Sequence, residues 1–299
     1  MRGRYPGFLA LLLVLSISGT ARGDDGGHLL SLWQVNGIHN HVYLLGSIHL
    51  LRAQDHPLPS AIYAAYDDAD KLIMELDMDD MDPVEGQVLS NELGIIHDGR
   101  TLSDLMGEAG YREAERLAVA AQIPLALLAQ SEPWYAAMTV EIMVLMRMGF
   151  NPSLGIETHL MELAGADRKE ILGFETMRQQ LEFLDGLSPT AQREMLLQAL
   201  AESEGMRETM DSMIDAWRTG DIAFLEENLL SDMQDYPELN DIIVVQRNID
   251  WTNQIEALLD DNDDYLIVVG TLHLVGDEGV PDLLRSRGHE VRQLRQPAE

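Results

Sequence analysis

The sequence predicts an α/β protein whose single mixed sheet is built from both chain ends, with a large helical insertion between them. Short apolar runs typical of buried strands lie near both ends of the chain, whereas residues 83–236 carry apolar side chains mostly at helical spacing. Two of the terminal runs also share one pattern, YLLGSIHL at 43–50 and IVVGTLHL at 267–274. We therefore expect strands from the two ends to lie side by side.

The N-terminal elements follow from the hydrophobic pattern. The apolar runs at 29–35 and 41–45 are separated by the turn-like NGIHN, which predicts a β-hairpin. A helix is expected around 59–68. The apolar run in KLIMELDM then predicts a short buried strand that ends near Glu75.

The insertion and the C-terminal part complete the predicted order. Helices are expected at 112–122, 134–148, 190–202 and 207–218. One strand, EILGF, interrupts this helical region and is followed by the helical ETMRQQLEFL. A helix over 238–259, the apolar strand DYLIVVG, a short helix and the edge strand HEVRQL follow.

The first residues have the order of a secretory signal peptide. Arg2 and Arg4 precede an apolar stretch over 8–17 and a small-residue run. The apolar stretch is about half of the roughly 20 residues that span a bilayer. We therefore expect a signal peptide over 1–23, an exported protein that is periplasmic or extracellular, and one domain over 24–299 with no membrane span after cleavage.

The composition excludes several classes of function. The 299 residues include no cysteine, so disulfides and thiolate chemistry are ruled out. The formal net charge of -31 repels nucleic acid and anionic lipid, so a nucleic-acid partner is not expected. Three explanations of the acidity stay open: a solvated surface, adaptation to salty surroundings, or attraction of cations and basic substrates.

The repeated pattern places a histidine three residues after a glycine at each strand exit. A glycine there permits a sharp turn or lets a ligand approach the backbone, so Gly46 and Gly270 are candidate substrate contacts. The histidines His49 and His273 would then share one site beyond the carboxyl ends of the strands. The alternative for either histidine is a hydrogen-bonded structural role.

Glu75 is the natural third member of this group. A carboxylate after an apolar run is costly to bury unless it is paired or coordinates an ion. Two histidines and a carboxylate form a common hydrolytic metal set. His49, His273 and Glu75 are therefore candidate ligands of a divalent metal (Mn, Co or Zn), with a structural salt bridge as the alternative for Glu75.

Several stretches together resemble the TraB, PrgY and GumN proteins, which are related to the Tiki proteases and more distantly to erythromycin esterases and ChaN. The stretches are YLLGSIHLL, LIMELD, GIETHLMELA, GFETMRQQLEFL, QRNIDW and YLIVVGTLHLVGDEGVPDLLRSRGHEV. The resemblance covers nearly the whole mature chain and implies an α/β core with a hydrolase-like centre. The family pattern usually has aspartate where Glu157 stands and an aliphatic residue where Phe174 stands.

The resemblance also implies roles for residues. Tiki relatives act as metal-dependent proteases, whereas esterase relatives use an equivalent histidine and glutamate without a required metal. Carried over, His49, Glu75 and His273 hold the central roles. Arg247, from QRN, would bind a substrate carboxylate or a developing oxyanion, with an ion pair to one of the many acids as the alternative.

Three further polar residues are weaker candidates. Glu175 follows a strand and is a candidate substrate contact, although a helix-starting carboxylate explains it equally well. Asn248, beside Arg247, is assigned to substrate binding. Glu157 opens a predicted helix, where capping or packing explains it better than ligation.

The expected function is hydrolysis of a peptide, amide or ester bond, in a peptide or small-molecule substrate. The centre would act either with a metal or with His49 as a general base oriented by Glu75. The alternative is a non-catalytic protein that binds a metal, haem or a small ligand such as a peptide signal. The sequence leaves open whether the protein forms a homodimer.

Overall fold

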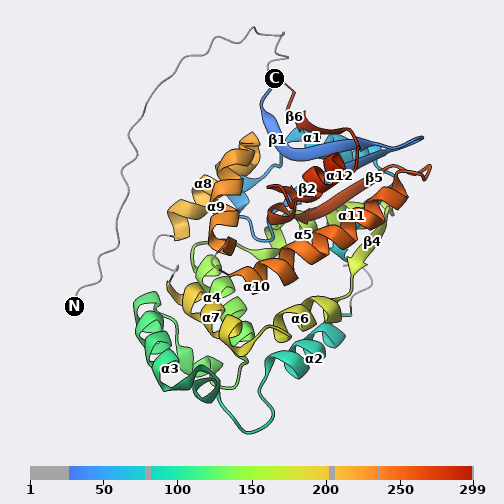
Figure 1. Ribbon diagram of the computed structural model, residues 1–299. Helices are drawn as coiled ribbons and strands as arrows, with labels where there is room; N and C mark the ends of the chain where they lie inside the picture. The colour runs from blue at the N-terminus through green and yellow to red at the C-terminus, as the bar shows by residue number, and fades with distance from the viewer. Residues whose placement is uncertain (1–26, 78–81, 202–205, 235, 298–299) are drawn as a thin grey trace.

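The computed structural model describes residues 27–77, 82–201, 206–234 and 236–297 of the chain (Figure 1). The predicted signal peptide lies outside the described residues. The strands of the sheet are β1 (Leu29–Asn36), β2 (His41–Ser47), β3 (Lys71–Leu76), β4 (Glu170–Glu175), β5 (Tyr265–Gly270) and β6 (Val291–Arg295). Their spatial order is β4-β3-β5-β2-β1-β6, so strands from both chain ends form one sheet, as predicted.

The sheet is mixed, with a parallel part and an antiparallel edge. The predicted hairpin is confirmed, because β1 pairs antiparallel with β2, and β6 pairs antiparallel with β1 at the edge. Strands β2, β5, β3 and β4 all run parallel, and Ser47 on β2 lies opposite Gly270 on β5. The carboxyl ends of these four strands therefore meet along one edge of the sheet.

Helices cover both faces of the sheet, because its strands are apolar on both sides. On one face lie α1 (Ser60–Asp68), α5 (Ile156–Asp167), α8 (Met206–Thr219) and α9 (Ile222–Gln234). On the other face lie α11 (Gln246–Leu258) and α12 (Val280–Ser286). The alternation along β3 shows the division, since Leu72 and Met74 join the first core and Ile73 joins the second.

Within the predicted insertion, β4 belongs to the sheet and α5, α8 and α9 pack on it. The remaining helices of the insertion form a separate layer beside the sheet (Figure 1). The helices of this separate layer are α2 (Pro83–Gly94), α3 (Leu102–Ala121), α4 (Pro133–Arg147), α6 (Met177–Asp185) and α7 (Pro189–Ala201). A third apolar core joins α3, α4 and α7. Helix α2 packs against α6, and these two helices follow β3 and β4, so they stand at the carboxyl edge of the parallel strands.

Two helices differ from their predicted extents. Helix α3 begins ten residues before the predicted start, because Thr101 and Asp104 form a capping box and Gly107, with φ of 69°, kinks the helix and interrupts the periodic pattern. The helix expected over 238–259 is divided into α10 (Pro237–Asn240), a π-helical turn over Asp241–Val245, and α11.

No helix within the described residues is both long and apolar enough to cross a membrane.

Candidate functional site

Each of the four parallel strands delivers one polar side chain to the same edge of the sheet. His49 follows β2, Glu75 is the fifth residue of β3, Glu175 ends β4, and His273 follows β5. In open α/β sheets, ligands bind beyond the carboxyl ends of the strands. The structure therefore brings the predicted histidines and Glu75 together at the edge where ligand binding is expected.

These side chains surround the space over Gly270. A Cβ atom added to Gly270 would lie 3.3 Å from Glu75 Oε1, 3.6 Å from His273 Cδ2 and 3.9 Å from His49 Nε2. Any residue other than glycine would therefore fill the point on which the three side chains converge. A neighbouring cavity of about 240 Å³ is lined by His49 and Glu75, so a ligand can reach them from solvent.

His49 is held by Glu157, the second residue of α5. The Nδ1 atom of His49 lies 2.7 Å from Glu157 Oε1, and the hydroxyl of Ser47 donates to the same oxygen. Glu157 also lies at the N-terminus of α5, where the helix dipole favours a negative charge. Because Nδ1 is engaged, Nε2 is the ring nitrogen that faces the space over Gly270.

The Glu157 contact also sets the charge of His49. The negative charge of Glu157 raises the pKa of His49 to about 9, although partial burial acts in the opposite direction. At neutral pH the imidazole of the free protein is therefore mostly protonated. Its side chain is 64 % exposed, so it can exchange protons with solvent or with a ligand.

Glu75 is a fixed carboxylate. Its Oε1 accepts from the amide of Gly270 at 2.8 Å, and its Oε2 accepts from Arg247 Nη2 at 2.7 Å and from Gln180 Nε2 at 3.1 Å. Burial alone would raise the pKa of Glu75, but the surrounding histidines, Arg247 and the Gly270 amide lower it to about 2. Glu75 is thus charged at neutral pH and presents Oε1 to the space over Gly270.

Arg247, at the start of α11, is 7 % exposed and uses every donor that it has. A guanidinium group carries five N–H donors. They are directed to Glu175 Oε1 (2.9 Å), Ile243 O (3.1 Å), His273 Nε2 (3.1 Å), Glu75 Oε2 (2.7 Å) and Glu175 Oε2 (2.8 Å). Of the two roles considered for Arg247, the structure shows the ion pair with acidic residues, which are Glu75 and Glu175. No guanidinium hydrogen is left for a substrate carboxylate or an oxyanion.

His273 is a buried, neutral histidine. Its Nδ1 lies 2.7 Å from Asn248 Oδ1, and the amide nitrogen of Asn248 donates to the carbonyl of Glu278 at 2.8 Å. The amide orientation is therefore fixed, so Nδ1 donates and Nε2 accepts from Arg247. Burial lowers the pKa of His273 to about 4, in agreement with a neutral ring at pH 7.

Three predicted substrate contacts lie away from the space over Gly270. Asn248 is fully buried and holds His273 instead. Glu175 accepts from Arg247 and from the indole nitrogen of Trp251, so it is a counter-charge of the arginine. Gly46 is buried, and a Cβ atom there would lie 2.9 Å from Thr271 Oγ1, so its role is close packing of β2 against the turn that follows β5.

The donor set does not fit the expected three-ligand metal centre. His273 presents carbon Cδ2 to the space over Gly270, because both of its ring nitrogens are hydrogen-bonded. The donors that remain there are His49 Nε2 and Glu75 Oε1, whereas catalytic zinc sites use three protein ligands. Within the described ranges, no group of three or more His, Asp or Glu side chains is placed to hold a metal ion. The cation that Glu75, Glu175 and His273 surround is the guanidinium of Arg247.

Two residues of the site were missed by sequence reasoning. Glu157 was assigned to capping or packing, although the usual aspartate at this family position already indicated an acid there. Gln180, on α6, donates to both Glu75 and Glu175, at 3.1 and 3.0 Å. No pattern in the sequence distinguishes it from its neighbour Gln179, which caps α6.

The fold and the site define a class of α/β proteins in which two Gly-x-x-His motifs from opposite chain ends meet over one sheet edge. The chain belongs to the TraB/PrgY/gumN family, whose model matches residues 31–293. It is 24 % identical over 250 residues to proteins of Escherichia coli (strain K12) and Shigella flexneri, each described as uncharacterized protein YbaP. The match covers 82 % of this chain and 88 % of each relative. No solved structure matches the chain.

Proposed function

We propose that the protein is a hydrolase of a peptide, amide or ester bond, and that the scissile carbonyl group binds over Gly270. The observation that carries this proposal is the convergence of His49 Nε2 and Glu75 Oε1 on one point, with His49 held on its other nitrogen by Glu157. A general-base centre consists of a carboxylate that holds one nitrogen of an imidazole, while the other nitrogen faces the space where the substrate reacts. Glu157, His49 and the space over Gly270 have this arrangement.

In the proposed reaction, neutral His49 is the general base. Glu75 Oε1 accepts a hydrogen bond from a water molecule over Gly270 and orients it. Nε2 takes a proton from this water as the water oxygen bonds to the carbonyl carbon. The resulting imidazolium then gives the proton to the leaving nitrogen or oxygen as the bond to carbon breaks. Glu157 stabilises the imidazolium throughout, which agrees with the raised pKa of His49.

The raised pKa predicts how the rate depends on pH. Since the base form of His49 is the minor form at pH 7, kcat/KM is expected to rise about tenfold per pH unit and to level off near pH 9. The proposed steps use only the side chains and a water molecule. A metal ion is not included, since only His49 Nε2 and Glu75 Oε1 are free to coordinate one over Gly270.

Turnover of a peptide and ester library tests the proposal. Purified wild type, His49→Ala and the control His39→Ala, which changes an exposed histidine in the hairpin turn, are compared. We expect wild type and His39→Ala to cleave the same members, and His49→Ala to lose about 100-fold to 10,000-fold in kcat. Ligand binding that depends on His49, with no turnover of any library member, would instead favour the non-catalytic alternative.

A further inference from the structure

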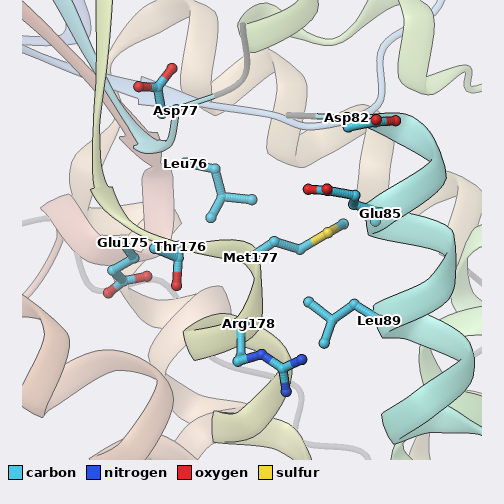
Figure 2. A pocket seen from close by; sticks show the side chains of 10 residues that line it. Leu76, Asp77, Asp82, Glu85, Leu89, Glu175, Thr176, Met177 and Arg178 are labelled. Carbon is cyan, nitrogen blue, oxygen red and sulfur yellow. The ribbon is translucent and has the colours of Figure 1, made fainter. Parts of the chain in front are cut away.

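A second cavity adjoins the reaction centre, between the end of β3 and the helices α2 and α6 (Figure 2). It has a volume of about 320 Å³. Leu76 lines both this cavity and the one at His49, and it follows Glu75 directly in β3. One residue of an extended chain spans about 3.3–3.6 Å, so a peptide held at Glu75 reaches the second cavity within a few residues.

The floor of the second cavity is apolar. Leu76 comes from β3, Leu89 from α2 and Met177 from α6. Figure 2 shows Met177 extending from α6 toward α2, between Leu76 and Leu89. Gly86 permits this approach, because a Cβ atom there would lie 3.1 Å from the sulfur of Met177.

One carboxylate points into this cavity without a partner on the described chain. Figure 2 shows Glu85 extending from α2 toward Leu76, and no hydrogen bond or ion pair joins Glu85 to another described residue. Other charged side chains that line the cavity have partners, and Glu175 pairs with Arg247 at 2.8 Å. Asp82 caps α2 at the amide of Val84 (2.7 Å), and Arg178 pairs with Glu92 (3.2 Å).

We propose that this second cavity is a subsite for one basic residue, lysine or arginine, of an extended peptide substrate; this proposal rests on the proposed function. Lysine and arginine bury their methylene stems on apolar surface while the charged head stays near water. Leu76, Leu89 and Met177 offer that surface, and Glu85 offers the counter-charge. The net charge of -31 adds long-range attraction for a basic peptide. This assigns part of the acidity to the third explanation, attraction of basic substrates.

Peptide binding measured without turnover tests the subsite. Fluorescent peptides that differ at a single position, with lysine, norleucine or glutamate there, are scanned through the sequence and titrated by anisotropy against the His49→Ala background. We expect lysine to bind about fivefold more tightly than norleucine at one position, as for a partly exposed ion pair. Glu85→Gln should abolish this preference, and Glu85→Lys should transfer it to the glutamate peptide.

The control is Glu115→Gln, which removes the same charge from an exposed position on α3 and should keep the lysine preference. Equal binding of the lysine and norleucine peptides at every position would overturn the subsite, even if wild type hydrolyses them. A lysine preference that Glu115→Gln abolishes as well would also overturn it, because the attraction would then come from net charge alone. A preference lost only in Glu85→Gln, with no hydrolysis by wild type, would uphold the subsite and refute the hydrolase.

Discussion

Replacing Arg247 by methionine tests the balance of the buried ion-pair cluster. Methionine keeps much of the length of the side chain and can pack on Trp251, whose ring centroid lies 4.6 Å from the guanidinium carbon. It removes five hydrogen bonds and leaves the carboxylates of Glu75 and Glu175 without a cation. Their side chains are 15 % and 9 % exposed, so water cannot replace the lost contacts fully.

The expected loss in free energy of unfolding is about 3–5 kcal/mol at pH 7, the usual cost of removing one partner from a buried ion pair. For a protein of this size, each kcal/mol corresponds to about 2–4 °C in Tm, so Tm should fall by roughly 6–20 °C. The loss should shrink near pH 4. In wild type, the folded-state pKa of Glu75 is depressed to about 2, so its stabilising effect is present above the unfolded value and is lost only as pH falls toward 2. In the variant, the unpaired carboxylates gain protons, which relieves their repulsion.

Urea unfolding followed by tryptophan fluorescence at pH 7 and pH 4 provides the measurement. Arg247→Lys should lie between wild type and Arg247→Met, because lysine keeps the charge but has three donors instead of five. Adding Glu175→Gln to Arg247→Met should recover part of the loss, since one uncompensated charge disappears. A loss below about 1 kcal/mol at pH 7, or an equal loss at both pH values, would refute this account of the cluster.

Four other predictions follow from the same contacts. In Glu157→Gln, the pKa of His49 should fall from about 9 toward its ordinary value of about 6.5, measured by NMR of the ring nitrogens. Because the folded-state pKa of His49 is raised, its contribution to wild-type stability is complete below about pH 6.5 and is lost as pH rises through about 9. Chemical unfolding of wild type should show this decrease in the free energy of unfolding. The Glu157→Gln variant should not show it. Asn248→Ala should cost about 1–3 kcal/mol in urea unfolding, because Nδ1–H of His273 loses its buried acceptor. Manganese or zinc should raise the Tm of Arg247→Ala, in which the freed carboxylates and His273 can coordinate an ion, and should leave the Tm of wild type unchanged.

The convergence of the two Gly-x-x-His motifs could be predicted from the sequence because it depends on strand ends. Apolar runs identify the strands, and parallel strands present their carboxyl ends at a common edge. The hairpin, the edge strand and the position of Glu75 beside the histidines follow from the same pattern. The pattern of apolar residues shows which segments are buried strands and at which residue each strand ends, so the residues at the strand ends can be predicted.

The partners within the site could not be predicted in the same way. Glu157 reaches His49 because the start of α5 lies beside the exit of β2, where the amide of Ile156 donates to the carbonyl of Ile48 at 3.2 Å. That contact depends on how the insertion returns to the sheet, which no local pattern encodes. The role of Arg247 was left open for a similar reason, since 51 acidic residues offer many partners and only the fold selects Glu75 and Glu175.

The position of β5 between β2 and β3 determines when the candidate site can assemble during synthesis. The ribosome completes residues 41–47 and 71–76 early, yet these two strands do not pair with each other. Each of them pairs with residues 265–270, which emerge much later. A chain that stops before that point lacks the shared neighbour, as well as the glycine over which the two side chains meet. The site therefore depends on a strand that is completed late in translation and is followed by α12 and β6.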